Sequence, residues 1–370
     1  MRIRIPLAAA TAVAALATCV TGAAAGTGET AGSAAPRNAC SPSVALGGYS
    51  DALDKTTHDG LPVAGLSALA PDTHGRIAAL SDRSALFSLD VRTHGGDGTP
   101  DARTVSGTPL ADEKGGPLDS EGLVVERDGT RLVTSETEPS VRRYDRRGTF
   151  TGERLPVPDA LRVAPAGRAQ QNQTFEGLTA RQGGRSLVAS MEGQLTGDGK
   201  DAHGRPLVRF QSWQRHGGGQ GGGHGAYGLA RQWGYPVDPK LGVAEIADAG
   251  HGRLLVLERG WEKGTGNTVR LYLADPRRAS DVSRVGKLTG TSGARLVHKR
   301  LLADLADCPD LGAPNPSPQK NPLLDNIEAL AVTGHAPGGR LRLLLASDDN
   351  ESAGQITRLY TLTARLPGAP

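Results

Sequence analysis

Residues 172–194, "NQTFEGLTARQGGRSLVASMEGQ", contain two short apolar runs separated by Gly183 and Gly184. Glu176 comes just before the first run and Glu192 just after the second. Short apolar runs on either side of a glycine turn predict a β-hairpin. In an antiparallel hairpin, the start of the first strand and the end of the second lie at the same end of the sheet. We therefore expect the two glutamates on one rim.

The same unit occurs four more times along the chain. Each copy has an apolar run, a glycine-containing turn, a second run rich in Leu, Val and Ala, and then a carboxylate. The copies are residues 63–83, 119–138, 243–261 and 325–350. A further alternating run follows most of them, so that three strands are clear and a fourth is weakly marked. Repeated small antiparallel sheets are typical of a β-propeller. A β-sandwich and an open solenoid are the alternatives, and a sandwich would not explain one recurring unit with acids at the same two places.

We therefore predict an all-β fold, a β-propeller of four-stranded antiparallel blades, and we expect six blades. Five of them correspond to the five repeated units. The sixth is expected to combine residues 43–51, "SVALGGYSD", with residues 294–305, "ARLVHKRLLADL". The propeller domain is expected to cover residues 43–366.

Acids recur at two positions of the unit, before the first strand and after the second. The equivalent pairs are Glu121 with Glu136, Glu245 with Glu258, and Glu328 with Asp348, while the first unit has Asp82 but carries Gly65 at the other position. A propeller would direct these strand ends toward one mouth of its central channel. The predicted ring of nine carboxylates consists of Asp82, Glu121, Glu136, Glu176, Glu192, Glu245, Glu258, Glu328 and Asp348.

Nine converging carboxylates need a counter-charge, because two of them about 4 Å apart repel by roughly 4 kcal/mol at an effective dielectric constant near 20. Protonation, basic residues or metal ions can supply it. Oxygen ligands without converging His or Cys favour a hard cation, and Ca²⁺ suits an irregular site with many carboxylates. Arg83 follows Asp82 and Arg259 follows Glu258. These arginines either bind an anionic substrate group bidentately or neutralise the acids.

The composition argues against several classes of function. The chain has 42 basic and 39 acidic residues, so its charge gives no reason to expect nucleic acid or a membrane surface as a partner. Neither a G-x-S-x-G nucleophile motif, nor H-E-x-x-H, nor C-x-x-C, nor a Walker loop is present. We expect a monomer that acts on a small anionic molecule.

The N-terminus is typical of a secreted protein. Residues 1–25 have basic residues before an apolar run and end in an A-x-A site, which predicts a signal peptide. The run is short for a helix that stays in the membrane, and a lipoprotein signal at Cys19 is the alternative. Residues 26–42 are small and polar and are expected to form a flexible lead-in. Cys40 and Cys308 then remain, and in an oxidising compartment they are expected to form a disulfide rather than two free thiols.

Four motifs in this order resemble the phytase-like family, described as "esterase-like activity of phytase". They are "DSEGLVV", "FEGLTA…GGRSLVASMEG", "GRLLVLERGW" and "IEALAV…LLLASDDN", and the resemblance runs from about residue 63 to residue 362. It implies a secreted bacterial propeller. More loosely, it implies a relationship to the six-bladed calcium-dependent phytases, which hold Ca²⁺ in an acidic channel mouth and hydrolyse phosphate monoesters with a metal-activated water. Few lysines lie near the expected rim, which argues against inositol hexaphosphate itself.

Together these features predict a secreted Ca²⁺-binding propeller that hydrolyses ester bonds, with phosphate monoesters as the leading substrate class. Ca²⁺ would be held by Glu121, Glu176, Glu192, Glu245 and Glu328. A carboxylate such as Glu192 would orient the attacking water, and Arg83 and Arg259 would hold the anionic group. A carboxyl esterase or lactonase that uses the same funnel is one alternative. A non-catalytic binding propeller with a structural Ca²⁺ is the other.

Overall fold

The computed structural model describes residues 38–94, 98–217 and 225–368. The predicted signal peptide and Cys19 lie outside these residues, and so do residues 26–37 of the predicted lead-in. Within the described chain, the helical elements are single turns of 3-10 helix such as Asp159–Leu161, and no helix is long and apolar enough to cross a membrane. The fold is all-β, as the glycine-rich alternating sequence predicts.

Twenty of the described strands form five four-stranded sheets, which are the blades of a propeller. Blades 1 and 2 consist, from inside to outside, of β4 (Leu66–Pro71), β5 (Ile77–Ser81), β6 (Ala85–His94) and β7 (Thr99–Pro109), and of β8 (Ser120–Val125), β9 (Arg131–Ser135), β10 (Ser140–Tyr144) and β11 (Phe150–Arg154). Blade 3 consists of β12 (Phe175–Arg181), β13 (Ser186–Met191), β14 (Leu207–His216) and β15 (Ala226–Pro236).

The last two blades follow the same plan. Blade 4 consists of β16 (Gly242–Gly250), β17 (Arg253–Glu262), β18 (Gly266–Asp275) and β19 (His298–Asp304). Blade 5 consists of β20 (Asn326–Ala336), β21 (Arg340–Asp348), β22 (Leu359–Ala364) and β1 (Val44–Ser50). All pairings within the blades are antiparallel, and a two-residue ladder of β2 (Thr57–His58) with β3 (Leu61–Pro62) stands apart from them.

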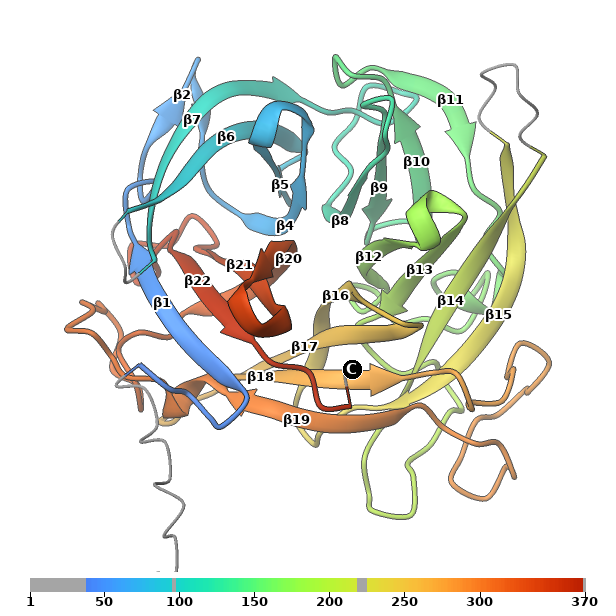
Figure 1. Ribbon diagram of the computed structural model, residues 1–370. Helices are drawn as coiled ribbons and strands as arrows, with labels where there is room; N and C mark the ends of the chain where they lie inside the picture. Colours follow the sequence, from blue (N-terminus) through green and yellow to red (C-terminus); the bar gives the residue numbers. More distant parts are fainter. Residues whose placement is uncertain (1–37, 95–97, 218–224, 369–370) are drawn as a thin grey trace, which may run out of the picture. The chain divides into compact units, whose positions relative to one another are not determined.

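The inner strands β4, β8, β12, β16 and β20 surround a common centre (Figure 1). Each of them contacts the inner strands of both neighbouring blades, including β20 with β4, so the ring is closed. Corresponding positions of the five inner strands therefore face one another across a central channel.

The prediction of six blades is wrong, because five are present among the described residues. The two segments assigned to a sixth blade are outer strands of other blades: β1 completes blade 5 beside β22, and β19 completes blade 4 beside β18. An outer strand has a neighbour on one side only and lies far from the channel, so its apolar pattern is weak. This is why the fourth strand of these two units is not recognisable beside the other three.

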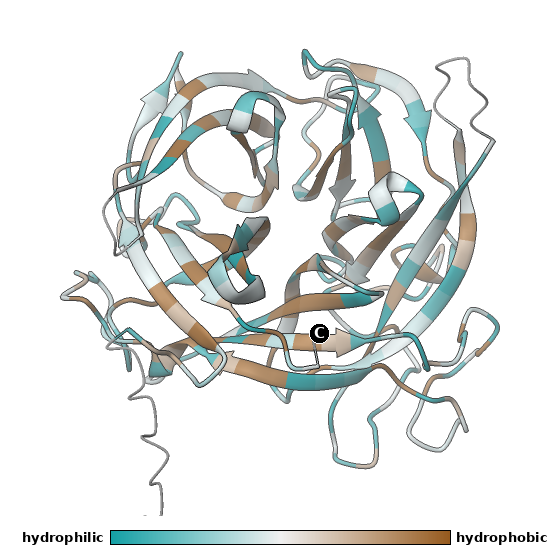
Figure 2. Cartoon of the chain, viewed as in Figure 1, coloured by the Kyte–Doolittle hydropathy of each residue, from teal (hydrophilic) through white to brown (hydrophobic). Residues whose placement is uncertain are grey.

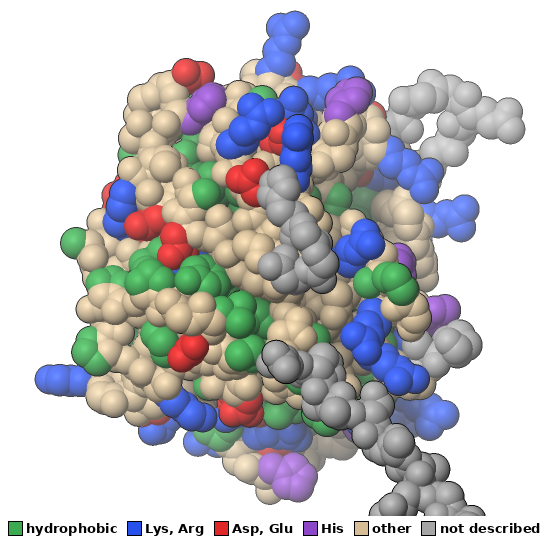
Figure 3. All heavy atoms as spheres, turned by 60° about the vertical axis from the view of Figure 1, so that its left-hand side comes forward, with side chains coloured by type: hydrophobic (Ala, Val, Ile, Leu, Met, Phe, Trp, Pro, Cys, Tyr) green, Lys and Arg blue, Asp and Glu red, His purple; other side chains and the backbone are tan. Residues whose placement is uncertain are grey.

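Buried hydrophobic clusters join neighbouring blades: one combines Val124 of blade 2 with Phe175 and Trp213 of blade 3, and another combines Phe210 and Tyr235 of blade 3 with Ile246 of blade 4. Within blade 3, Phe175 and Trp213 pack edge to face with ring centroids 5.8 Å apart, and Phe210 stacks on Tyr235 at 4.8 Å. All four side chains are fully buried. Figure 2 shows hydrophobic residues on strands of every blade, and Figure 3 shows acidic, basic and hydrophobic side chains side by side on one face of the molecule.

The predicted disulfide between Cys40 and Cys308 is confirmed, with an S–S distance of 2.04 Å. Cys40 lies just before β1, and Cys308 follows the single helical turn Leu305–Asp307 after β19. The bond therefore joins the residue that precedes the outer strand of blade 5 to the end of blade 4.

Candidate acidic channel mouth

Each inner strand contains a β-bulge near its beginning, where one extra residue interrupts the pairing with the second strand. The extra residue is Ser67 in blade 1, Ala244 in blade 4 and Glu328 in blade 5. In blades 2 and 3 the extra residue is one of residues 121–122 and one of residues 176–177. Glu121 and Glu176 directly follow the last paired residue before the bulge, as Ser67, Ala244 and Glu328 do in the other blades. Bulges re-aim a side chain and are frequent next to functional sites.

A second set of equivalent positions lies at the end of the second strand of each blade. The residue before each bulge pairs with a residue of the second strand, and the position in question is the next residue along that strand. The five residues at this rim position are Asp82, Glu136, Glu192, Arg259 and Asp348. The bulge and rim positions together carry seven of the nine predicted acids, which we call the mouth carboxylates: Asp82, Glu121, Glu136, Glu176, Glu192, Glu328 and Asp348. The sequence reasoning thus found both recurring positions in blades 2, 3 and 5, and in blade 1 it found Asp82 but assigned the other position to Gly65 rather than Ser67.

The structure does not bring Glu245 and Glu258 to these positions. In blade 4, Val243 pairs with Glu258 and the bulge is at Ala244. Both acids are therefore displaced by one residue relative to the other blades, and side chains alternate between the two faces of a strand. Glu258 is instead fully buried between blades 3 and 4, where its carboxylate accepts hydrogen bonds from Lys299 Nζ (2.5 Å), the Tyr235 hydroxyl (2.6 Å) and the backbone N–H of Asp238 (2.9 Å).

Burial and the charges of neighbouring acids raise the pKa of six mouth carboxylates: Asp82, Glu121, Glu136, Glu176, Glu192 and Asp348. Burial is the larger cause for Glu121 and Glu176, whose pKa values lie well above the ordinary range, and neighbouring acids from other blades add to it. The pKa of Glu136 rises to about 7 through burial and then the charge of Glu192. That of Asp348 rises to about 8 through burial and then the charge of Glu328. The fold thus keeps these acids so buried and so close together that, without a counter-ion, some of them must be protonated.

Arg259 supplies a positive charge within the ring, because the displaced register of blade 4 puts it at the rim position. Its Nη2 lies 2.5 Å from Glu328 Oε1 and 3.9 Å from Glu192 Oε1, so it joins blades 3, 4 and 5. Its Nε is buried and has no hydrogen-bond partner in the described chain. Arg83 is different: it is more than half exposed and lies 3.7 Å from both Asp82 and Glu351, at the outside of the mouth.

Three mouth carboxylates lie close enough to share one metal ion. Oxygen atoms of Glu136, Glu176 and Glu192 all lie within 4.8 Å of one another. Ca²⁺ binds oxygen at about 2.4 Å, so two ligands on opposite sides of one ion are about 4.8 Å apart. The trio therefore fits the coordination sphere of a single Ca²⁺, and oxygen-only donors are the type this cation prefers. Glu136 comes from blade 2 and the other two from blade 3.

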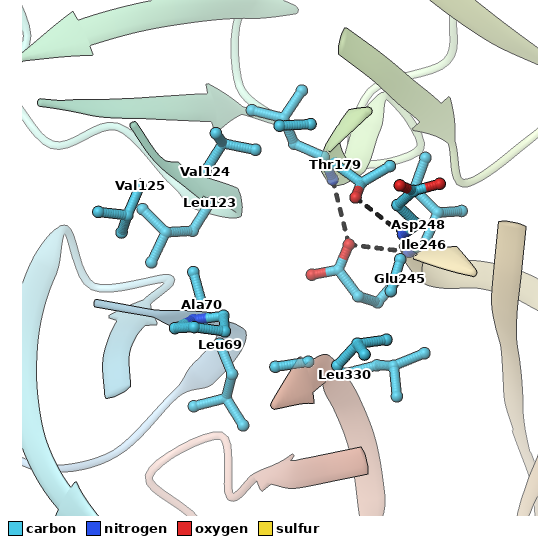
Figure 4. Close-up of a pocket in the computed structure, with 16 residues that line it drawn as sticks. Leu69, Ala70, Leu123, Val124, Val125, Thr179, Glu245, Ile246, Asp248 and Leu330 are labelled. Carbon is cyan, nitrogen blue, oxygen red and sulfur yellow. Dashed lines mark hydrogen bonds between the residues drawn. The ribbon is translucent and has the colours of Figure 1, made fainter. Parts of the chain in front are cut away.

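The channel becomes apolar below the mouth. Two positions after the bulge, the five inner strands carry equivalent aliphatic residues, all buried: Leu69, Leu123, Leu178, Ile246 and Leu330. They line a cavity of about 290 Å³, into which Glu245 also projects (Figure 4). A charged solute therefore meets a polar surface at the mouth and an aliphatic one beneath it.

Glu245 bonds to the protein backbone at this level. Its Oε1 accepts hydrogen bonds from the N–H groups of Ile246 (2.8 Å) and Leu178 (3.1 Å), where the bulge of blade 3 leaves the backbone unpaired (Figure 4). Burial raises the pKa of Glu245 well above its usual range despite these bonds. The side chain thus connects blades 3 and 4 within the channel.

The sequence reasoning missed three further charged groups, Asp119, Lys55 and Asp349. Asp119 directly precedes β8 with a positive φ of 51°, and its charge raises the pKa of Glu121 and Asp82. Lys55 donates to the carboxylate of Asp349, whose other oxygen accepts the N–H of Gly65 at 3.2 Å. Asp119 belongs to the quoted repeat and could have been found there, whereas Lys55 lies outside every repeat.

These features define a β-propeller with an acidic channel mouth. The sequence profile of the phytase-like family, described as "esterase-like activity of phytase", matches residues 61–351. The chain belongs to this family, whose description points to an esterase-like hydrolase. No curated protein matches the chain.

Several solved structures are similar to the chain at low identity. The family AA12 carbohydrate-active enzyme of Trichoderma reesei is 11% identical, over 89% of this chain and 98% of that one, with a TM-score of 0.38. The Cps50 (Swd1) propeller domain of Myceliophteria thermophila is 12% identical, over 79% and 67%, with a TM-score of 0.35. A streptogramin B lyase is 9% identical, over 84% and 97%, with a TM-score of 0.33. We draw no functional argument from these three.

Proposed function

We propose that the protein is a Ca²⁺-dependent hydrolase of ester bonds, with phosphate monoesters as its substrates. The observation that carries this proposal is the trio of Glu136, Glu176 and Glu192, whose oxygen atoms lie within 4.8 Å of one another in the mouth. The family description supports ester hydrolysis as the reaction class.

The metal would be held by this trio, with Glu121 and Glu328 close by in the ring. When bound, Ca²⁺ supplies positive charge that polarises an ester oxygen and lowers the pKa of a bound water. Glu176 is 5% exposed and suits a permanent anchor. The Glu192 side chain is 21% exposed, so a water entering from solvent meets this carboxylate first, and Glu192 is positioned to accept its proton.

Arg259 would bind the anionic group of the substrate. A guanidinium stays charged at every relevant pH and forks toward phosphate or carboxylate oxygens. Because Arg259 lies among the mouth carboxylates, it would bind only an anionic group that enters the mouth and lies next to Glu136, Glu176 and Glu192. Arg83, at the outside of the mouth, would add a second contact for a longer anionic substrate.

We further propose that the protein acts outside the cell as a monomer. The Cys40–Cys308 disulfide supports this setting, because disulfides persist in oxidising compartments. Extracellular Ca²⁺ sites also need only modest affinity, with dissociation constants of about 10⁻⁴–10⁻³ M.

The test is a hydrolysis assay on protein dialysed against chelator. p-Nitrophenyl phosphate, phytate and p-nitrophenyl acetate are compared before and after Ca²⁺ is added. We expect phosphate release only with Ca²⁺, and loss of competition by inorganic phosphate in Arg259→Gln. Acetate hydrolysis without phosphate release would instead identify a carboxyl esterase or lactonase, and phosphate release in chelator would contradict the proposal.

One observation favours a second candidate, a non-catalytic propeller that Ca²⁺ stiffens. The trio combines one carboxylate of blade 2 with two of blade 3, so an ion there would cross-link two blades. This candidate predicts that Ca²⁺ raises the melting temperature while none of the three esters is hydrolysed.

A further inference from the structure

A polar groove of about 430 Å³ lies beside the mouth and shares Arg259 and Glu328 with it. One wall is the hairpin of β17 and β18 in blade 4, and the other is formed by the loops around Ser317 and Asn350. Arg259 is the one Lys or Arg among the described residues that line it. A ligand in this groove would therefore reach the ring with one end and extend away from it with the other.

Trp261 is the aromatic side chain of this groove, and its side chain is largely open to solvent, with 64% exposure. The other two tryptophans, Trp213 and Trp233, are 0% and 6% exposed. Trp261 lies two residues after Arg259 on β17 and directly opposite Asn267 on β18. Residues two apart on a strand share a face, and so do directly opposed residues of an antiparallel pair. One face of the hairpin thus presents a guanidinium, an indole and an amide.

A single exposed apolar residue is common on protein surfaces and would carry nothing alone. The second observation is a set of three asparagines in the groove that all use their NH₂ groups within the protein. Asn267 donates to Gln319 (3.2 Å), Asn326 to Glu328 (3.0 Å) and Asn350 to Gln355 (3.2 Å).

This arrangement leaves the three side-chain carbonyl oxygens as hydrogen-bond acceptors. None of them has a donor in the part of the chain that the structure describes. Acceptors in a polar groove pair with donors that a ligand brings, and hydroxyl groups are such donors. An aromatic face adjacent to these acceptors suits a ring that carries C–H groups on its face and hydroxyls on its edge.

We propose that this groove binds the neutral sugar ring of the substrate, with the indole of Trp261 stacked on its C–H face. The substrate class is then a sugar ester with a single anionic group, which Arg259 holds at the ring. The absence of any second Lys or Arg from the described lining disfavours a ring with several phosphates. The sugar subsite rests on the proposed function, because the ester hydrolysis proposed there identifies the end of the substrate that reacts.

Acrylamide quenching of tryptophan fluorescence tests the groove without any turnover. Since the other tryptophans are buried, the quenchable emission comes from Trp261. We expect methyl β-D-glucopyranoside and glucose 6-phosphate to protect this emission, with the phosphate binding more tightly. A neutral saccharide on one stacking platform is expected to have a dissociation constant of about 1–10 mM.

Variants then separate a built subsite from unspecific stacking. Trp261→Ala should weaken saccharide binding, measured by titration calorimetry, by about tenfold, because it removes the stacking surface. Asn267→Ala should weaken it in the same direction. Leu229→Ala, at another exposed apolar residue on the outer strand of blade 3, is the control and should bind as the wild type does.

The subsite is overturned if no saccharide protects Trp261, or if Asn267→Ala and Trp261→Ala bind as tightly as the control. Ca²⁺-dependent hydrolysis of p-nitrophenyl phosphate alongside either result would leave the proposed function standing. Protection of Trp261 in a protein that hydrolyses no ester would support the sugar site and overturn the hydrolase instead.

Discussion

Blades 3 and 4 have the same sequence pattern and place it differently. In both, a glutamate opens the inner strand and another closes the second strand. In blade 3 these are Glu176 and Glu192, which lie in the mouth, whereas in blade 4 Glu245 and Glu258 are displaced by one residue at the bulge. A strand alternates its faces every residue, so one step is enough to send a side chain to a different environment.

The difference also changes the charge of the ring. In blade 4, Glu258 pairs with Lys299, Glu245 accepts the N–H groups of Ile246 and of Leu178 in blade 3, and Arg259 occupies the rim position. A propeller of five copies can therefore build an acidic channel mouth from four similar blades and one in which the register differs. The first three predictions below test this contrast, from the largest expected effect to the smallest, and the fourth tests the charge of the mouth.

Lys299→Ala should cause the largest loss of stability. Lys299 Nζ lies between Glu258 (2.5 Å) and Asp238 (2.8 Å), with 3% of its side chain exposed. Removing one partner of a buried ion pair costs about 3–5 kcal/mol, because a buried charge remains without compensation. Urea unfolding measures the change in the free energy of unfolding.

The control for this variant is Lys240→Ala, which removes an exposed pair with Glu262 in the same blade. Such surface pairs contribute about 0–1 kcal/mol. Equal losses in the two variants would mean that Glu258 does not depend on Lys299.

Glu192→Gln and Glu258→Gln change acids that occupy the same place in the sequence unit. We expect Glu192→Gln to weaken Ca²⁺ binding by about 100-fold, or about 2.7 kcal/mol, because it removes a charged member of the trio. Glu258→Gln should lower the melting temperature and leave the Ca²⁺ affinity of the folded protein unchanged. Titration calorimetry decides, and equal affinities for the two variants would break the distinction between the blades.

Gly177→Ala tests the contact between the two inner strands. A Cβ at Gly177 would lie 2.5 Å from both Glu245 Oε1 and the backbone N of Ile246, so β12 and β16 could not approach as closely. Overpacking of this kind costs about 1–3 kcal/mol. Gly286→Ala, where a Cβ meets nothing within 4 Å, is the matched control in a melting experiment. A stability of Gly177→Ala equal to that of the control would show that the strands can separate at no cost.

The fourth prediction is a pH dependence of stability to which the mouth carboxylates contribute. In chelator, the raised carboxyl pKa values favour the folded protein when the acids are protonated. This contribution is complete below about pH 4, the ordinary carboxyl range, and is lost as the pH rises through about 6 for Asp82 and about 8 for Asp348. The melting temperature should therefore fall between pH 5 and pH 8.5, flanking these values.

Asp348→Asn provides the check on this prediction, because the asparagine does not titrate. The alkaline part of the decline should become flatter in this variant. A melting temperature that is constant across the same range in the wild type would contradict the raised pKa values.

The fold class and most of the mouth could be predicted from the sequence, because they follow from a repeated local pattern. Apolar runs, glycine turns and acids recur at fixed spacing, and the antiparallel hairpin converts that spacing into a common rim. The pairing of Cys40 with Cys308 was also predictable, since they are the two cysteines outside the predicted signal peptide.

The number of blades and the role of blade 4 could not be predicted in this way. Strand β1 pairs with β22, more than three hundred residues away in sequence, and the residues of β1 do not indicate which strand they pair with. The register of blade 4 depends on which residue bulges, and "VAEIAD" permits either Ala244 or Glu245. Packing against Gly177 of the neighbouring strand and the pairing of Glu258 with Lys299 favour the observed choice, and both are contacts outside the hairpin.

The position of Cys40 also determines how the molecule would respond to mechanical load. Val44 at the start of β1 pairs with Ala364 at the end of β22, so force applied directly to these two ends would open the ladder one residue pair at a time. Cys40 lies ahead of β1 and is bonded to Cys308. A pull on the residues that precede Cys40 therefore passes through a covalent bond to the end of blade 4, and the closing strand of the propeller is spared.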